Sequence, residues 1–241
     1  MMRLDRLLCE AGFGTRSQVK GLVKKGLVQV NGRTAGRPEQ KVDEKNDRIL
    51  CEGKEAVVGS SVYLMLNKPP GVVSVTEDAR ERTVLDLLNE QDRKGVFPVG
   101  RLDKDTEGLL LLTDDGTLAH RLLSPRRHVD KVYRARVEGQ VTKAHIISFR
   151  EGLDIGEKAP TLPAELEILS GGEVSEVKVT IREGKFHQIK RMFESVGCRV
   201  IWLKRLQMGT LSLDEELPAG AYRKLRREEV ESLRKLTGQV P

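Results

Sequence analysis

Four consecutive leucines at residues 109–112 constrain the fold more than any other segment of the chain. The run lies between Gly108 and Thr113, and neighbouring side chains of a strand point to opposite faces of a sheet. An uninterrupted apolar run of this length therefore predicts a strand that is buried on both faces. The Asp-Asp-Gly sequence at residues 114–116 is expected to turn the chain into a helix.

Strand and helix patterns alternate along the rest of this region. Residues 63–66 form a second apolar run, which predicts another buried strand. Val177, Val179 and Ile181 alternate with polar residues, which predicts a half-buried strand in an antiparallel region. Helical patterns occur at residues 117–123, 142–150 and 186–196. The mixture predicts the α+β class, with a mixed, mostly antiparallel sheet flanked by helices.

The first fifty residues show a different pattern. Thr15 and Gln18 have the spacing of a capping box, and Gly26 is a good C-terminal cap, so we expect a short helix over residues 16–25. Cations recur every four residues along this helix, which places three of them on one exposed face. Such a face could lie along a phosphate backbone; its members are Arg16, Lys20 and Lys24.

The charge of the chain is concentrated at this end. Overall, 42 Lys and Arg residues against 36 Asp and Glu residues give a formal net charge of +6. Residues 1–37 contain eight basic side chains against Asp5 and Glu10. A basic patch favours a polyanion because each neutralised phosphate releases a counterion. From charge alone, an ordinary solvated basic face is an equally good interpretation.

A hairpin follows the helix. Residues 28–30 precede Asn31 and Gly32, a dipeptide typical of tight hairpin turns, and Leu4, Leu7 and Leu8 predict an earlier helix. This helix, helix, hairpin order resembles the RNA-binding domain of ribosomal protein S-four, which implies RNA binding without implying chemistry. We expect an RNA-binding domain over residues 1–52, a linker over 53–61 and a catalytic domain over 62–241.

Residues 100–108, Gly-Arg-Leu-Asp-Lys-Asp-Thr-Glu-Gly, form a polar loop between two apolar segments. For an acidic loop of this kind, a purely structural role is the default interpretation. The longer string GRLDKDTEGLLLLTDDG, however, closely resembles the signature of the RsuA and RluB group of pseudouridine synthases. The resemblance implies that Asp103 is the catalytic carboxylate, whereas the position of Asp105 varies in the family and Asp105 is expected to be solvated.

Lys131-Val132-Tyr133 matches a Lys-x-Tyr segment of the same family. Taken alone, Tyr133 is a core tyrosine, because Tyr133, Ala135 and Val137 alternate as one face of a strand. The resemblance implies instead that the Tyr133 ring contacts the target base and that Lys131 contacts RNA.

The third matching segment runs from Glu183 to Phe193. Its buried stripe leaves Lys190 on the flank of the predicted helix, from which a cation can reach inward. The resemblance implies that Lys190 is the basic partner of the aspartate; many family members have Arg there, which alone offers a bidentate fork. It also implies RNA contacts from three further residues, which are His187, Gln188 and Arg191.

The implied reaction breaks the glycosidic bond, turns the detached uracil and rejoins it to the sugar through ring carbon five. It needs no redox step, metal or cofactor. An ionised Asp103 could attack the sugar, attack the uracil ring or remove a sugar proton, and a cation at Lys190 would offset the cost of burying its charge. The base must be flipped out of structured RNA, and Arg101 is a candidate wedge or phosphate clamp.

Three cysteines at wide spacing, Cys9, Cys51 and Cys198, predict neither a disulfide framework nor a zinc site, which fits a reducing compartment. The N-terminus carries early charges instead of an apolar signal segment, and no apolar run approaches the length of a membrane helix. A cytoplasmic protein without membrane contact is expected.

The form Phe-His-Gln-Ile-Lys-Arg-Met-Phe at residues 186–193 is more similar to the branch that modifies small-subunit (16S) ribosomal RNA. We therefore predict a monomeric 16S pseudouridine synthase that acts on ribosomal RNA, within an assembling small subunit. Three alternatives stay open. They are the same chemistry on 23S ribosomal RNA, a non-catalytic RNA-binding or assembly factor, and a glycosidase-like hydrolase that uses Asp103 and Asp105.

Overall fold

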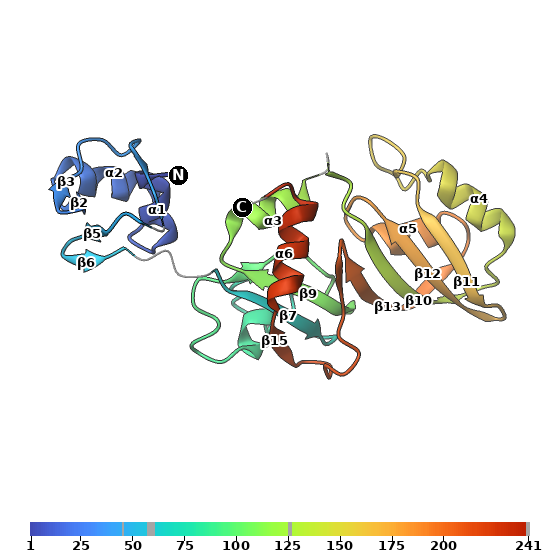
Figure 1. Ribbon diagram of the computed structural model, residues 1–241. Coiled ribbons are helices and arrows are strands. Elements are labelled where there is room, and N and C mark those ends of the chain that lie inside the picture. The colour runs from blue at the N-terminus through green and yellow to red at the C-terminus, as the bar shows by residue number, and fades with distance from the viewer. Residues whose placement is uncertain (45, 57–60, 125–126, 240–241) are drawn as a thin grey trace. The chain divides into compact units, whose positions relative to one another are not determined.

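The computed structural model describes residues 1–44, 46–56, 61–124 and 127–239. The chain divides into two compact units, Met1–Ser61 and Val62–Pro241 (Figure 1). Of the linker expected over residues 53–61, Lys54 and Glu55 instead form the last strand of the first unit's sheet, and residues 57–60 lie outside the described residues. None of the helices described is long and apolar enough to cross a membrane.

In the first unit, two helices pack on a small sheet. Leucines of α1 and valines of α2 share one core with the strands, and the capping box forms as expected, with the Thr15 amide donating to Gln18 Oε1 at 2.8 Å. The helix ends at Lys24, one residue earlier than predicted. Arg16, Lys20 and Lys24, hereafter the α2 cation row, are all exposed. The helices are α1 (Leu4–Glu10) and α2 (Arg16–Lys24).

Asn31 and Gly32 form the predicted turn, both with positive φ, of 51° and 77°. The turn joins the first two strands of a four-stranded sheet of order β3-β2-β5-β6, and a separate two-stranded sheet pairs β1 with β4. The strands are β1 (Met2–Arg3), β2 (Val28–Val30), β3 (Arg33–Thr34), β4 (Lys41–Val42), β5 (Ile49–Cys51) and β6 (Lys54–Glu55).

The second unit is built on a nine-stranded sheet whose main path runs β11-β12-β10-β13-β9-β7-β15. Strand β14 pairs with β13 and β8 with β9, and among these pairs only β13 with β9 is parallel. The sheet is therefore mixed and mostly antiparallel, as predicted. Its strands are β7 (Tyr63–Lys68), β8 (Phe97–Pro98), β9 (Glu107–Thr113), β10 (Lys131–Glu138), β11 (Glu165–Ser170), β12 (Val174–Ile181), β13 (Arg199–Met208), β14 (Leu211–Ser212) and β15 (Tyr222–Lys224).

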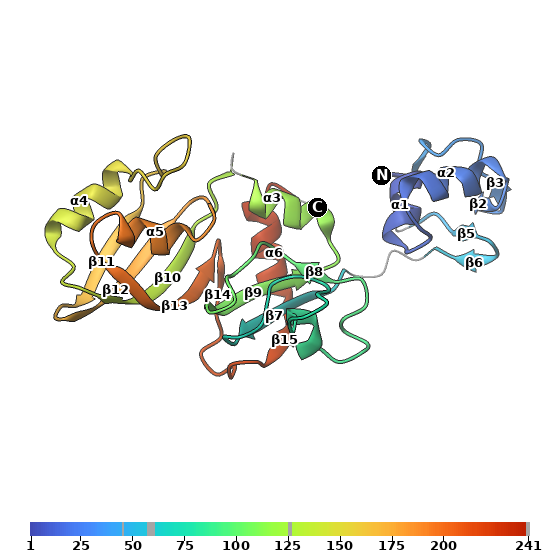
Figure 2. The same ribbon diagram turned by 180° about the vertical axis from the view of Figure 1, so that it is seen from behind.

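Helices cover both faces of this sheet (Figures 1 and 2). Leu109 and Leu111 pack with α3 and α6, whereas Leu110 and Leu112 belong to the core that includes α4 and α5. The prediction of a strand buried on both faces is confirmed. The helices are α3 (Gly116–Leu123), α4 (Lys143–Glu151), α5 (Gln188–Glu194), α6 (Arg227–Leu236) and the short 3-10 helix η1 (Val84–Leu87).

The two halves of the sheet meet where β9 runs parallel to β13. Gly108 has a φ of 99°, and a Cβ at this position would lie 2.2 Å from the Arg205 carbonyl oxygen. Only glycine permits this close approach of two backbones. The polar loop before Gly108 is thereby held at the end of β9, beside β13.

Helix α5 is shorter than the pattern predicted. The prediction began it at Phe186, but His187 adopts a left-handed conformation with a φ of 47°, so the helix begins at Gln188. Phe186 and His187 therefore lie in the turn that precedes the helix. Ile189, Met192 and Phe193 form its buried stripe, as expected.

Candidate active site

The polar loop between β8 and β9 is held by a lysine that is completely buried. Lys68 stands at the end of β7, and its ammonium donates to the carbonyl oxygens of Pro69, Lys104 and Thr106 at 3.1, 3.2 and 2.8 Å. Burial lowers the pKa of Lys68 to about 8, against the opposing charges of nearby carboxylates. The side chain thus stays mostly protonated at neutral pH and fixes the backbone on either side of Asp105.

Sequence reasoning missed this lysine as a working part of the site. Local sequence pattern does not mark Lys68, because the Lys104 and Thr106 carbonyl oxygens that satisfy its buried charge are 36 and 38 positions away in the sequence.

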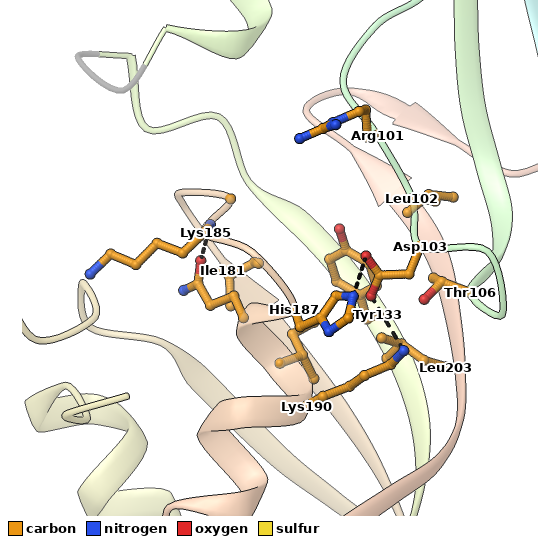
Figure 3. A pocket seen from close by; sticks show the side chains of 13 residues that line it. Arg101, Leu102, Asp103, Thr106, Tyr133, Ile181, Lys185, His187, Lys190 and Leu203 are labelled. Carbon is orange, nitrogen blue, oxygen red and sulfur yellow. Dashed lines mark hydrogen bonds and ion pairs between the residues drawn. The ribbon is translucent and has the colours of Figure 1, made fainter. Parts of the chain in front are cut away.

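Three segments of the second unit enclose a cavity of about 90 Å³ (Figure 3). The first is the polar loop, the second is a group of three neighbouring strands (β10, β12 and β13), and the third is the turn that leads into α5 together with the start of that helix. The lining includes Arg101, Leu102, Asp103, Thr106, Tyr133, Ile181, His187, Gln188, Ile189, Lys190 and Leu203. At roughly 10–15 Å³ for each water-sized group, the space suits one flat ring and not a chain of nucleotides.

Asp103 lies between two basic side chains. Its Oδ2 is 3.4 Å from the Lys190 Nζ, and its Oδ1 is 3.6 Å from the His187 Nε2, contacts that Figure 3 marks with dashed lines. The Asp103 side chain is 28% exposed and that of Lys190 is 19% exposed, so solvent reaches both only in part. The structure thus brings an acid and a cation that are far apart in sequence to one end of the cavity.

Lys190 is shared between two carboxylates. Its Nζ lies 2.6 and 2.9 Å from the two oxygens of Asp105, closer than it lies to Asp103. Partial burial opposes the charge of Lys190, but the hydrogen bond to Asp105 and the two carboxylate charges raise its pKa above the ordinary value. Asp105 was expected to be solvated. Its side chain is 71% exposed, which agrees with that expectation, and its carboxylate is in addition paired with Lys190.

The position of Tyr133 is compatible with both interpretations of the sequence. It lies on the buried face of β10 and is 7% exposed, as a core tyrosine would be. Its ring also lines the cavity together with Ile181 and Leu203, which supply an apolar wall. A planar group in the cavity would therefore meet an aromatic ring on one side and a carboxylate at its edge.

Arg101 and His187, both predicted to contact RNA, also line the cavity. Arg101 is exposed, and its guanidinium has no hydrogen-bond or ion-pair partner within the part of the chain that the structure describes. A cation in this state is available to a phosphate or to the space left by a flipped base.

Two other residues that were predicted to contact RNA make hydrogen bonds within the fold. Gln188 is 4% exposed, and its amide accepts from the Lys185 backbone and donates to Glu183 at 3.0 Å. The Arg191 guanidinium donates to Glu157 and to the carbonyl oxygens of Phe186 and Ile155. These contacts hold the turn before α5, and an RNA contact from either side chain stays a prediction.

Lys131 is also turned inward. Its Nζ donates to the Val129 carbonyl oxygen at 3.0 Å. Burial and the nearby charge of Arg205 lower its pKa to about 8. Lys131 is not among the residues that line the cavity, and its contact with RNA stays a prediction.

Comparison with known proteins identifies the family of each unit. Residues 62–195 match the RNA pseudouridylate synthase family, and residues 2–49 match the S4 domain. The chain belongs to the RNA pseudouridylate synthase family and is an isomerase that carries an N-terminal S4 domain.

Several relatives resemble it over nearly their full length. An uncharacterised RNA pseudouridine synthase of Bacillus subtilis is 47% identical over 96% of this chain and 98% of the relative. The ribosomal small subunit pseudouridine synthase A of Vibrio cholerae is 41% identical over 96% of this chain and 99% of its own length. A crystal structure of a pseudouridylate synthase is 36% identical, with a TM-score of 0.70, over 97% of this chain and all of that chain.

Proposed function

We propose that this protein converts one uridine of small-subunit (16S) ribosomal RNA to pseudouridine, with Asp103 as the reacting carboxylate. The observation that carries the proposal is the position of Asp103. Its carboxylate stands at one end of a ring-sized cavity, 3.4 Å from Lys190 and 3.6 Å from His187, with Tyr133 in the wall. The choice of 16S RNA is supported by the name of the Vibrio cholerae relative.

The chemistry requires a bare carboxylate. The bond between the sugar and uracil N1 breaks, a new bond forms between the sugar and ring carbon five, and the proton of carbon five is finally lost while N1 gains one. Atoms and electrons balance without an oxidant. Asp103 in its ionised form serves each of the three routes, by attack on the sugar, by attack on the ring or by removal of a sugar proton.

Four other residues of the cavity support the reaction. The ammonium of Lys190 compensates the charge of a partly desolvated Asp103, so the carboxylate stays reactive when RNA excludes water from the cavity. Tyr133 packs against the uracil ring and keeps the detached base from leaving before it is rejoined. Arg101 binds the phosphate of the flipped nucleotide, and His187 contacts the oxygen of Asp103 that does not face Lys190.

RNA binding is assigned to residues 1–52 and catalysis to residues 62–241. The α2 cation row supplies phosphate contacts, which hold RNA without selecting the base. We further propose that the protein acts as a monomer in the cytoplasm. Its substrate is a small subunit that is still being assembled, because flipping a base costs least where the RNA is weakly paired.

The test is release of tritium from RNA that carries the label at uracil carbon five. Transcripts of 16S and 23S ribosomal RNA are compared, with wild type and Asp103→Asn. We expect release from 16S RNA by the wild type and none by Asp103→Asn. Release only from 23S RNA would show that the substrate is 23S and not 16S RNA. Tight binding without release would favour a non-catalytic RNA-binding protein, and free uracil as the product would favour a hydrolase.

A further inference from the structure

Phe186 differs from the other phenylalanines of the chain. Its side chain is 69% exposed, whereas Phe149 and Phe193 are completely buried. Phe13 and Phe97 are intermediate, so Phe186 is the one exposed phenylalanine among those that the structure describes. Burial of an aromatic ring is favourable, and the fold leaves this ring uncovered.

The Phe186 ring is presented in a fixed way. It stacks on the His187 imidazole, with ring centroids 3.8 Å apart and planes inclined by only 19°. The backbone around it is held as well, because the Phe186 carbonyl oxygen accepts from Arg191 and the Lys185 amide donates to Gln188. The left-handed conformation of His187 ends the turn and keeps both rings outside α5. Little conformational entropy remains to be lost when a ligand stacks on the outer ring.

The stack connects the surface with the reacting carboxylate. His187 lines the cavity and its Nε2 lies 3.6 Å from Asp103, while Phe186 lies on the exposed side of the same stack. A nucleotide whose base enters the cavity brings its neighbour along the RNA strand to this edge. The neighbouring base has lost its stacking partner, and an exposed aromatic face is what replaces such a partner in single-stranded RNA recognition.

We propose that Phe186 is a stacking platform for an unpaired nucleobase that flanks the target uridine. The inference rests on the proposed function for the identity of the flipped base. Stacking on a ring face tolerates any base, so the platform holds the RNA in place after flipping and does not by itself choose the sequence. Phe186 acts on substrate binding and not on the bond-breaking step.

Four variants separate stacking from simple hydrophobicity. Phe186→Ala and Phe186→Leu remove the aromatic face, and Phe186→Tyr and Phe186→Trp keep one. Ile147→Ala, which trims another exposed apolar side chain of the same unit (56% exposed), is the matched control. The main readout is the concentration of 16S RNA that gives half-maximal tritium release in single turnover.

We expect Phe186→Ala and Phe186→Leu to raise this concentration by about 5- to 150-fold, the range of one base stacked on an aromatic ring. The maximal rate at saturating RNA should stay within about threefold of wild type. The two aromatic variants and Ile147→Ala should resemble wild type. An unchanged value for Phe186→Ala would overturn the proposal, as would wild-type behaviour of Phe186→Leu or a fall in the maximal rate alone.

A second measurement does not depend on turnover. Binding of a single-stranded RNA of about twelve nucleotides to Asp103→Asn is compared with and without Phe186→Ala. Weaker binding of the double variant supports the stacking platform even if the wild type releases no tritium. Absence of tritium release would contradict the proposed function and leave the stacking platform standing. Equal binding would overturn the platform and leave the ring as a contact for another protein.

Discussion

Replacement of Lys190 by Met tests the electrostatic part of the site. Lys190 Nζ and Asp103 Oδ2 are 3.4 Å apart, and two unit charges at this distance interact by about 5 kcal/mol at an effective dielectric constant of about 20. Solvent reaches both side chains in part, and Asp105 holds the same ammonium, so most of this energy is not available to the reaction. We expect a net loss of about 2 kcal/mol, intermediate between exposed and buried ion pairs.

A loss of this size slows the chemical step by about 30-fold. The assay is single-turnover tritium release at saturating RNA, combined with a separate measurement of RNA binding. Lys190→Met should lower the rate constant and leave RNA affinity nearly unchanged. Lys190→Arg should lose less, because the charge is retained although its geometry differs.

Lys104→Met is the matched control. Lys104 neighbours Asp103 in the same loop, but its ammonium is paired with Glu81 at 2.7 Å and points to a different partner. Its single-turnover rate should equal that of wild type. If Lys190→Met also reacts at the wild-type rate, the cation is not needed and the electrostatic reasoning is refuted.

Three further outcomes follow from the geometry. Lys68→Met should lower the free energy of unfolding by about 3 kcal/mol, because three carbonyl oxygens lose a buried ammonium, and an unchanged urea midpoint would contradict the clamp. Partial burial opposes ionisation of Asp105, but the hydrogen bond from Lys190 lowers its pKa, so the ionised form favours folding. The wild type should therefore have a larger free energy of unfolding than Asp105→Asn at neutral pH, and this difference should disappear as the pH falls through the lowered pKa of Asp105. A difference that does not depend on pH would refute the pairing. Glutamine in place of the α2 cation row should flatten the dependence of log affinity on log salt by about 2, and an unaltered slope would exclude phosphate contacts there.

Much of the fold follows from local chemistry that the sequence displays. The leucines at residues 109–112 identify a strand covered on both faces, and the capping box of Thr15 and Gln18 marks the start of α2 to the residue. The Asn31-Gly32 turn is equally local, since both residues tolerate positive φ. Each of these features depends on neighbours in the chain, which is why periodicity and turn chemistry suffice.

The site depends on partners that are distant in sequence. Asp105 and Lys190 are 85 positions apart, so their pairing appears only when β9 and α5 are brought together by β13. The inward turn of Arg191 likewise depends on the Ile155 carbonyl oxygen, which is distant in sequence, whereas helical periodicity places that side chain outward. Apolar spacing alone predicted a helix that begins at Phe186, and it gave no sign of the left-handed conformation of His187 that delays the start of the helix.

The most direct test compares the two carboxylates that share Lys190. In cells lacking this protein, pseudouridines of 16S ribosomal RNA are mapped after complementation with wild type, Asp103→Asn or Asp105→Asn. One pseudouridine should be absent without the protein and be restored by wild type and by Asp105→Asn, but not by Asp103→Asn. Restoration by Asp103→Asn would contradict the assignment of the chemistry to that carboxylate.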